Sequence, residues 1–413
     1  MTLFRAAILN PTGPHSWDFY PDGGLVIRNG LIEAIGAFDD VAGHRGLDPV
    51  ILNGIILPGF ADVHIHWVQH AVRGRFSKEL MPWLRTHIWP EEARYADSDF
   101  AQEKARCFFS DLLSAGTVMG MAYSSPHIDA TTYAYSAMRG DWMMGNTIMT
   151  SNAPGYLTQV SARVPADLLP LYATLGRAHY AVTPRFALNC TADELAALGA
   201  WSQSKGLYVQ THLAESVEEI REVKAMFPEA IDYTDIYDRA GLLGARTVLG
   251  HCIHMSEREW RCLKARRCWI AHCPSSNEAL DSGRFDIGAC RHYQIPFALA
   301  TDVGAGPSHS MLHVMQRFLR QHRAAGISVD AQEALFRATL GGAQCMGRAS
   351  HAGNLQVGKR GDFVLMPKSS GQTSLEAWLE ELIDGNAADL ENRPLDTWIA
   401  GRSVRHGTPY FLP

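Results

Sequence analysis

Two histidines separated by one residue, His64 and His66, end a mostly apolar run early in the chain. The run contains a Pro58-Gly59 break, which predicts a buried strand entered through a turn. Because side chains on a strand alternate between its two faces, both imidazoles would point the same way and could bind one divalent metal. In a chain of 413 residues with 18 His, about 0.8 such pairs arise by chance, so two structural histidines are the open alternative.

Other ionisable or metal-ligating side chains stand where later apolar runs end. If these runs are the strands of one barrel, their carboxyl ends share a rim, which is where barrels carry their chemistry. One coincidence of this kind means little, but five on one rim are hard to attribute to chance. The side chains at the run ends, or within three residues of them, are His64, His66, Gln69, Arg185, Phe186, His212, Glu215, His251 and Asp302.

Strand-like runs alternate with helical patterns through the middle of the chain. Eight strands over residues 57–349 favour an α/β fold of the TIM (β/α)8 barrel type over an open doubly wound sheet. No GxGxxG motif follows the first strand, which argues further against a dinucleotide-binding, doubly wound fold. Ser216 and Glu219 fit a capping box at the start of one helix. The expected strands are 55–66, 117–124, 142–149, 180–186, 208–215, 247–254, 269–273 and 296–303, and the clearest helices are 99–114, 192–204 and 216–227.

The residue types at the strand ends indicate metal-assisted hydrolysis. Three His with one Asp form a nitrogen and oxygen site that suits Zn²⁺, with Fe²⁺ as the alternative. Such a metal lowers the pKa of a bound water, so that hydroxide is available near neutral pH. A neighbouring carboxylate, Glu215, is suited to moving protons to a substrate nitrogen. Barrels with two metals usually carry Lys or Glu at the end of strand four, where this chain has Arg185, so one metal is expected.

Each of these residues also has a structural interpretation that the sequence leaves open. His212 with Glu215 is compatible with a hydrogen-bonded pair at a helix start, and His251 is compatible with a packed core histidine. Asp302 fits a cap of the following loop, as Asp often does. Arg185 fits an ion pair on the rim.

Aromatic and histidine side chains outside the strand ends have weaker context. His272, at the seventh strand, is interpreted as structural or as a support behind the metal ligands. Trp67, Trp83 and Trp89 are suited either to lining a pocket for a flat ring or to ordinary core packing.

Both ends of the chain are typical of short strands with turns. Residues 25–35 give a hairpin signal around Asn29-Gly30, and 362–366 and 396–404 are strand-like. Two β-rich ends around one long middle predict a small β-sandwich domain assembled from both termini, which is more economical than two unrelated β appendages. The predicted domains are 1–56 with 350–413 for the small domain and 57–349 for the barrel.

Charge and cysteine content limit the partners and the compartment. A net charge of −6 without any block of Lys or Arg argues against nucleic acid and anionic membranes as partners. The eight Cys form no CxxC pair and no disulfide-framework spacing, which predicts reduced thiols in a cytoplasmic protein. The first residues lack the basic start and apolar run of a signal peptide, and no apolar run is long enough to span a membrane.

Several motifs follow one another along most of the chain. In order they are Leu57-Pro-Gly-Phe-Ala-Asp-Val-His64-Ile-His66 with Gln69, Trp83-Leu with Trp89-Pro-x-Glu92-x-Arg94, Val182-Thr-Pro-Arg185-Phe186, Thr211-His212-x-x-Glu215, Gly250-His251, Ala271-His-Cys-Pro-x-Ser-Asn277, Thr301-Asp302-Val-Gly and Ala338-Thr-Leu-Gly-Gly342. Together they resemble the amidohydrolase superfamily, marked by the HxH pair and the strand-eight Asp. Gln69, Arg185-Phe186 and the Trp-Leu to Trp-Pro segment narrow the resemblance to the guanine deaminase family.

The resemblance implies a catalytic role for each residue of the central group. His251 would orient the attacking water and stabilise the tetrahedral intermediate, and Glu215 would protonate the ring nitrogen next to the attacked carbon. Asp302 would accept the water proton and pass it to the leaving amine. The implied ligands of a single zinc per subunit are His64, His66, His212 and Asp302.

The resemblance also implies a substrate and an assembly. Gln69, Arg185 and Phe186 would hold a purine, because the fork of donors on Arg185 suits a ring carbonyl and Phe186 offers a stacking face. The reaction would convert guanine and water to xanthine and ammonia. The family further implies a homodimer.

Three features depart from the family pattern. After the strand-eight Asp the family often continues Gly-Gly, whereas this chain continues Gly304-Ala305-Gly306-Pro307, Trp67 is bulky beside the metal pair, and residues 125–160 match no part of the pattern. Such changes would reshape the pocket without altering the chemistry. Deamination of another aminated heterocycle, such as a pterin, 8-oxoguanine or an aminotriazine, is therefore the main alternative. A metal-free scaffold on the same fold is disfavoured, because every expected ligand and the acid–base pair are present.

Overall fold

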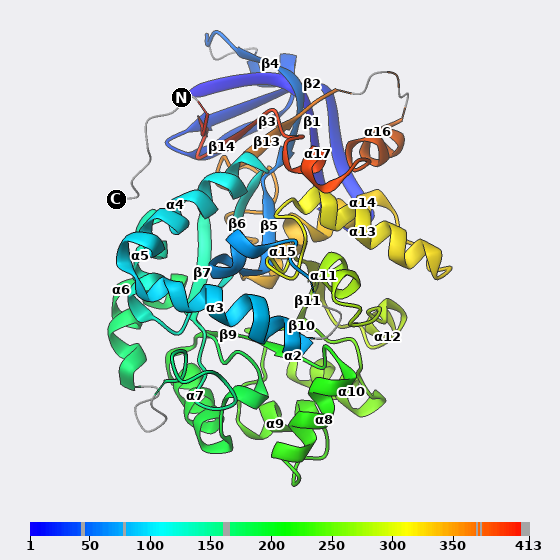
Figure 1. Cartoon of the computed structure of the whole chain (residues 1–413). Coiled ribbons are helices and arrows are strands. Elements are labelled where there is room, and N and C mark those ends of the chain that lie inside the picture. Colours follow the sequence, from blue (N-terminus) through cyan, green and yellow to red (C-terminus); the bar gives the residue numbers. More distant parts are fainter. Residues whose placement is uncertain (43–45, 77–79, 160–165, 369–370, 372–373, 406–413) are drawn as a thin grey trace.

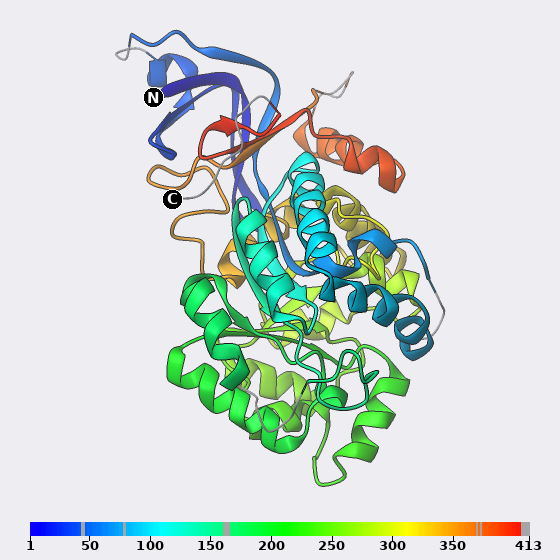
Figure 2. The same ribbon diagram turned by 60° about the vertical axis from the view of Figure 1, so that its left-hand side comes forward.

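The computed structural model describes residues 1–413 apart from 43–45, 77–79, 160–165, 369–370, 372–373 and 406–413. Strands from both ends of the chain form one seven-stranded sheet at one end of the molecule (Figures 1 and 2). The order of this sheet is β15-β14-β13-β4-β1-β2-β3. The strands are β1 (Thr2–Gly13), β2 (Ser16–Arg28), β3 (Leu31–Ala37), β4 (Val50–Pro58), β13 (Phe363–Met366), β14 (Asp396–Ile399) and β15 (Arg402–Ser403).

The centre of this sheet joins the two ends of the chain. β4 pairs in parallel with β1 on one side and antiparallel with β13 on the other. The buried amide of Asn10 reinforces the joint, because it accepts a hydrogen bond from the Leu355 N–H at 2.7 Å and donates one to the Leu355 carbonyl at 3.3 Å. The expected hairpin is present as β2 and β3, whose turn residues Asn29 and Gly30 both have positive φ. The described strands here belong to one sheet, so the second sheet of a β-sandwich and the domain boundaries stay predictions.

Eight parallel strands occupy the middle of the chain and overlap the eight expected runs. Three of them form the sheet β5-β6-β7 and five form the sheet β12-β11-β10-β9-β8. Their buried patterns are almost continuous, as expected for parallel strands covered on both faces. They are β5 (Phe60–His66), β6 (Thr117–Ser124), β7 (Asp141–Asn146), β8 (Ala181–Val182), β9 (Tyr208–Leu213), β10 (Thr247–His251), β11 (Trp269–His272) and β12 (Phe297–Leu299).

Helices separate these strands and surround them in both views (Figures 1 and 2). The capping box of Ser216 and Glu219 is confirmed at the start of α8. Within the described parts of the chain, no helix combines the length and apolarity needed to span a bilayer. The helices are α1 (Phe38–Ala42), α2 (Leu80–Trp83), α3 (Trp89–Ala93), α4 (Ser98–Ser114), α5 (Ile128–Ala137), α6 (Leu169–His179), α7 (Ala192–Lys205), α8 (Val217–Met226), α9 (Tyr233–Arg239), α10 (Glu257–Arg266), α11 (Pro274–Ala279), α12 (Ile287–His292), α13 (Met311–Ala324), α14 (Ala331–Arg337), α15 (Leu340–Cys345), α16 (Leu375–Leu382) and α17 (Ala387–Glu391), with shorter turns η1 (Trp67–Val72), η2 (Leu84–Ile88), η3 (Arg94–Ala96), η5 (Ala166–Leu168) and η6 (Ala187–Asn189).

The two parallel sheets contact each other where the first and last strands meet. The Asp302 N–H donates to the His64 carbonyl at 2.9 Å, and the His66 N–H donates to the Val303 carbonyl at 2.6 Å. The carboxylate of Asp62, which is fully buried, accepts from the backbone N–H and the hydroxyl of Thr301 and from the His64 N–H. These hydrogen bonds place the end of β5 against the segment that follows β12. The other ends of the two sheets, β7 and β8, are joined by isolated parallel bridges between β7 or the residues after it and the residues that flank β8.

We expect Asp62→Ala to lower the free energy of unfolding by at least about 3 kcal/mol, because it leaves three buried donors without their acceptor. The measurement is urea unfolding in the presence of a chelator, so that metal binding does not contribute. Asp18→Ala, which removes an exposed carboxylate from β2, is the control and should change stability by less than about 0.5 kcal/mol. Equal stability of the two variants would contradict the role of Asp62.

Candidate active site

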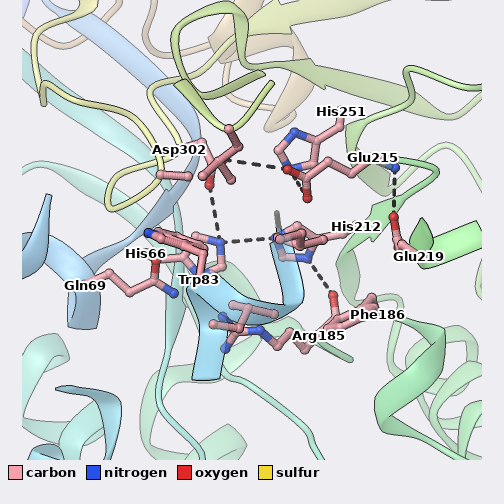
Figure 3. Close-up of a pocket in the computed structure, with 14 residues that line it drawn as sticks. His66, Gln69, Trp83, Arg185, Phe186, His212, Glu215, Glu219, His251 and Asp302 are labelled. Atoms are coloured by element: carbon pink, nitrogen blue, oxygen red, sulfur yellow. Dashed lines mark hydrogen bonds and ion pairs between the residues drawn. The ribbon is translucent and has the colours of Figure 1, made fainter. Parts of the chain in front are cut away.

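Five side chains from four strand ends converge at one rim of the parallel strands, and Figure 3 shows four of them, His66, His212, His251 and Asp302. Among the described residues, one group of His, Cys, Asp or Glu has ligand atoms that all lie within 4.8 Å of one another, and it consists of His64, His212, His251 and Asp302. His66 adjoins this group, because its Nε2 lies 3.2 Å from His212 Nε2 and 3.5 Å from Asp302 Oδ1. The structure therefore brings together every residue that the sequence predicts as a metal ligand.

The spacing of four of these groups can be compared with that of a tetrahedral metal site. Ligands at about 2.0–2.1 Å from a metal in a tetrahedron are separated by about 3.3–3.4 Å. The His64 Nε2 to Asp302 Oδ1 distance is 3.4 Å, and the two distances from His66 Nε2 are 3.2 and 3.5 Å. His251 is further out, with its Nε2 3.8 Å from Asp302 Oδ2. The residues present fit a single four-coordinate cation, with His251 beside it.

Burial prepares the imidazoles for metal binding. Desolvation lowers the pKa of His64, His66 and His212, so these rings are neutral at neutral pH, as a metal ligand must be. Burial acts to raise the pKa of Asp302, but His64 and His251 outweigh it and leave the pKa below its usual value. The site thus combines neutral nitrogen donors with one ionised oxygen donor.

Polar groups behind two of the imidazoles fix their orientation. His212 Nδ1 lies 2.6 Å from the Arg185 carbonyl oxygen, so it carries the proton and leaves Nε2 free to bind. His251 Nδ1 lies 2.9 Å from Asn277 Oδ1, and its Nε2 faces Glu215 and Asp302 at 3.5 and 3.8 Å. Partners of this kind set the tautomer and basicity of active-site histidines.

Glu215 stands beside the cluster as a buried carboxylate. Burial raises the pKa of Glu215 above its usual value, which suits a group that must donate a proton near neutrality. Burial acts to lower the pKa of His251, but Glu215 and Asp302 outweigh it and the pKa is raised. Ser282 donates from its hydroxyl to Glu215 Oε1 at 3.1 Å, and the Glu215 backbone N–H donates to Glu219 Oε2 at 2.9 Å. The first contact holds the Glu215 carboxylate and the second holds its backbone, so the side chain stays on the wall of the pocket.

A pocket opens from the cluster and takes in the three predicted substrate-binding residues. Gln69, Arg185 and Phe186 line it together with apolar side chains, and Figure 3 shows Gln69 and Arg185 on the opposite side of the drawing from His251 and Glu215. The other lining residues are His66, Leu80, Trp83, Leu84, His212, Glu215, Glu219, His251, Leu280, Asp302 and Ala305. A flat ring placed here would have ionisable groups at one edge and hydrogen-bond donors at the other.

Comparisons with known proteins assign this fold and site to a family. The model of the amidohydrolase family matches residues 55–404. A guanine deaminase of Escherichia coli (strain K12) is 34% identical over 359 residues, which cover 84% of this chain and 82% of that protein. The solved structure of E. coli guanine deaminase matches with a TM-score of 0.92 at 29% identity, covering 98% of this chain and 99% of the other. The structure of guanine deaminase from C. acetobutylicum with bound guanine matches with a TM-score of 0.88 at 26% identity, covering 97% and 99%.

The chain belongs to the guanine deaminase family of the amidohydrolases. The resemblance drawn from the sequence motifs is thereby confirmed, and the mixed α/β content agrees with the fold of this family. The chain spans most of the length of these relatives, including the strands from both termini.

The structure distinguishes pocket lining from core packing for Trp67, Trp83 and Trp89, and it shows the role of His272. Trp67 is buried with its ring against Tyr95 and does not line the pocket, so its bulk beside the metal pair leaves the pocket unchanged. Trp83 does line the pocket, whereas Trp89 is buried away from it. His272 lies in the core with its Nε2 3.1 Å from the Nε2 of His322, so the structural interpretation holds.

The loop after Asp302 keeps glycine at position 304 for a steric reason. The Gly304 N–H donates to Gln69 Oε1 at 3.2 Å. A Cβ added at Gly304 would lie 2.8 Å from the Gln69 carbonyl oxygen and 2.9 Å from its Cβ, so a side chain does not fit. Ala305, the residue that interrupts the expected glycines, lines the pocket.

Backbone strain is concentrated at the ends of the strands that carry the site. His251, Cys252 and Asp302 have φ of 67°, 51° and 51°, which is the left-handed region that side chains other than glycine rarely adopt. Each such residue costs of the order of 1 kcal/mol, and residues of this kind cluster at functional sites. The positive φ of His251 and Cys252 also accounts for the end of β10 at His251, before the expected end at residue 254.

Two buried residues of the site were given no role from the sequence. Glu92, at the end of α3, accepts hydrogen bonds from Gln69 and Arg185, and Asn277 holds His251. Both stand inside motifs that carry the family resemblance, and this position was the available signal. Their partners are distant in sequence, which left their roles unspecified.

The lowered pKa of His66 predicts a stability that depends on pH in the metal-free protein. The unfolded chain binds a proton on this imidazole below about pH 6.5, whereas the folded chain does not, so stability present above that pH is lost as the pH falls. Between about pH 7.5 and 5.5 the free energy of unfolding should fall by about 1.4 kcal/mol less in His66→Gln than in the wild type. Urea unfolding with a chelator at both pH values measures the difference.

The matched control is Tyr123→Phe. The Tyr123 ring packs 4.5 Å from the His66 ring, and burial raises the pKa of Tyr123, so its hydroxyl stays neutral in this range. This variant should keep the wild-type slope. A wild-type slope in His66→Gln as well would show that His66 is not held neutral by burial.

Proposed function

We propose that the protein is a zinc-dependent hydrolase that converts guanine and water to xanthine and ammonia. The observation that carries the proposal is one pocket in which a cluster suited to a metal, a buried carboxylate with raised pKa and the pair Gln69 and Arg185 line the same space. The relatives named guanine deaminase, and the relative whose structure holds guanine, support the same substrate.

His64, His66, His212 and Asp302 hold one zinc per subunit in this proposal, with Fe²⁺ as the alternative metal. Their nitrogen and oxygen donors suit either ion, and the spacing given above supports a single one. When bound, the metal supplies an activated water at neutral pH by lowering its pKa. Arg185 stands where a bridging ligand for a second metal would be required.

The protein's own groups then move the protons of the reaction. The oxygen of water bonds to the ring carbon that carries the amino group, and the bond from that carbon to the amine breaks. Asp302 accepts the proton that water loses and passes it to the leaving amine, which departs as ammonia. Glu215 protonates the adjacent ring nitrogen, and its raised pKa keeps a proton available for this step. When the amine has left, Glu215 takes back the remaining proton of the former water, so the product carries a carbonyl at that carbon and the carboxyl group is ready for the next turnover. His251, held by Asn277, orients the water and stabilises the negative charge that develops on its oxygen.

Gln69, Arg185 and Phe186 bind the purine. Arg185 offers donors to the ring carbonyl, and the ring of Phe186 offers a face for stacking. The apolar side chains Leu80, Leu84 and Leu280 support the flat base from the remaining walls of the pocket.

The proposal also includes a closed barrel, a composite β domain and a dimeric assembly. The contacts between β5 and the segment after β12, and the bridges between β7 and β8, support a closed (β/α)8 barrel of residues 57–349. The shared sheet of both termini supports a composite β-sandwich domain of 1–56 with 350–413. A homodimer in the cytoplasm completes the proposal.

Glu215→Gln should keep the metal but lower kcat by at least about a hundredfold, because a general acid contributes about that much. Ammonia release from guanine measures kcat, and elemental analysis measures the metal. Glu218→Gln, three residues along and exposed, is the control and should keep wild-type kcat. Near wild-type turnover in Glu215→Gln would remove this carboxylate from the mechanism.

Chelation should abolish ammonia release, and about one equivalent of Zn²⁺ per chain should restore it. His212→Ala should neither retain zinc after dialysis nor show the rise in Tm that zinc gives the wild type, because a ligand that binds only the folded state stabilises it. The control His292→Gln removes an exposed imidazole from α12 and should bind zinc normally. Full activity in the chelated protein would overturn the metal-dependent chemistry.

A further inference from the structure

One buried carboxylate contacts the pocket side chains without taking part in the chemistry described above. Glu92 is fully buried on α3, and both of its oxygens are engaged by residues that line the pocket. We propose that Glu92 is a positioning residue that makes the Gln69 and Arg185 end of the pocket a donor-only subsite, which selects a ring oxo group over an amino group. This inference rests on the proposed function and specifies how its substrate is recognised.

The contacts of Glu92 fix both neighbouring side chains at once. Arg185 Nη1 lies 2.9 Å from each Glu92 oxygen, and Gln69 Nε2 donates to Glu92 Oε1 at 2.7 Å. Arg185 is 3% exposed and Glu92 is 0% exposed, so the pair is shielded from solvent. Shielded, charge-assisted hydrogen bonds are strong and hold their partners in one orientation.

The orientation of the Gln69 amide follows from its two partners. A carboxylate accepts but does not donate, so the amide nitrogen must face Glu92. A peptide N–H donates but does not accept, so the amide oxygen must face Gly304. Both contacts require the same orientation, and a flipped amide would lose both. The amide therefore has its second N–H left for a ligand, while its oxygen is directed to the rim loop.

Arg185 adds donors to the same subsite and no acceptor. Its bonds to Glu92 use only Nη1, and a guanidinium has further N–H groups but no lone pair to offer. Because Glu92 balances its charge, this wall does not need an anion as its ligand. A neutral ring carrying an oxo group satisfies the donors, whereas an amino group at the same position would set N–H against N–H.

The protein should therefore prefer a base with a ring oxo group over one with an amino group at the same position, and this preference should depend on Glu92. Guanine and 2,6-diaminopurine both carry the 2-amino group that is released. They differ at position 6, where guanine has an oxo group and 2,6-diaminopurine an amino group, and at the neighbouring ring nitrogen, which carries a proton only in guanine. Sites built to hydrogen-bond one polar group reject an analogue that leaves their donors unpaired by large factors. We expect the folded wild type to favour guanine over 2,6-diaminopurine in kcat/KM by at least about a hundredfold.

Glu92→Gln tests this at nearly constant shape. The new amide can donate to Gln69 Oε1, so the Gln69 amide can turn and present its oxygen to the pocket, and Arg185 loses its charge partner. The preference for guanine should fall by at least about tenfold, with the loss for guanine mainly in KM and kcat within about threefold. Zinc content should match the wild type, because Glu92 contacts none of the proposed ligands.

Glu92→Asp is the conservative variant, and Glu259→Gln is the matched control. Aspartate keeps the acceptor that orients Gln69, so its preference for guanine should stay within about threefold of the wild type even if KM rises. Like Glu92, Glu259 is buried and accepts hydrogen bonds, in this case from the backbone N–H and the hydroxyl of Thr234. It lies outside this pocket, so Glu259→Gln should leave kcat/KM for both substrates unchanged.

A wild-type preference in folded Glu92→Gln would overturn the inference, as would a loss confined to kcat. If Glu92→Gln does not fold, Glu92→Asp decides through KM: a raised KM for guanine with kcat within about threefold supports the inference, because the shorter carboxylate holds Gln69 and Arg185 less well, and an unchanged KM together with an unchanged preference overturns it. If the wild type releases no ammonia from guanine, the proposed function fails instead, and the two failures are distinguished in one assay.

Discussion

The site depends on the junction between β5 and the segment that follows β12. Two backbone hydrogen bonds cross it, from Asp302 to His64 and from His66 to Val303, and the buried carboxylate of Asp62 ties Thr301 to the same strand. This junction brings a histidine pair near residue 65 and an aspartate near residue 302 within hydrogen-bond range of each other. It also joins the two parallel sheets, because His64 and His66 end β5 of one sheet, whereas His212, His251 and Asp302 stand at strand ends of the other.

Arg185 connects the two halves of the pocket through different parts of one residue. Its backbone carbonyl accepts from His212 Nδ1, and its guanidinium, held by Glu92, lines the opposite end of the cavity. One residue therefore contacts both the candidate metal cluster and the opposite end of the pocket.

The parts that could be predicted from the sequence are those that depend on periodicity. Alternation along a strand placed His64 and His66 on one face, and the ends of apolar runs located His212, His251 and Asp302. The roles of Glu92 and Asn277 could not be predicted in this way, because each is defined by a partner on another element. The choice between pocket and core for the tryptophans could not be predicted either, since residues 67–72 and 80–93 form helices of only four to six residues each, too short to show a period.

The shared sheet of the two termini has a consequence for synthesis. β4 lies in the middle of that sheet, yet its partner β13 begins only at Phe363, after all the parallel strands have been made. On the ribosome, the emerging N-terminal strands therefore leave one flank of β4 without a neighbour while the entire catalytic region is translated. An unpaired strand flank is a template for joining other chains. The nascent polypeptide therefore exposes this flank until β13 has emerged, and a ribosome that stalls before then releases a catalytic region attached to an open β-edge.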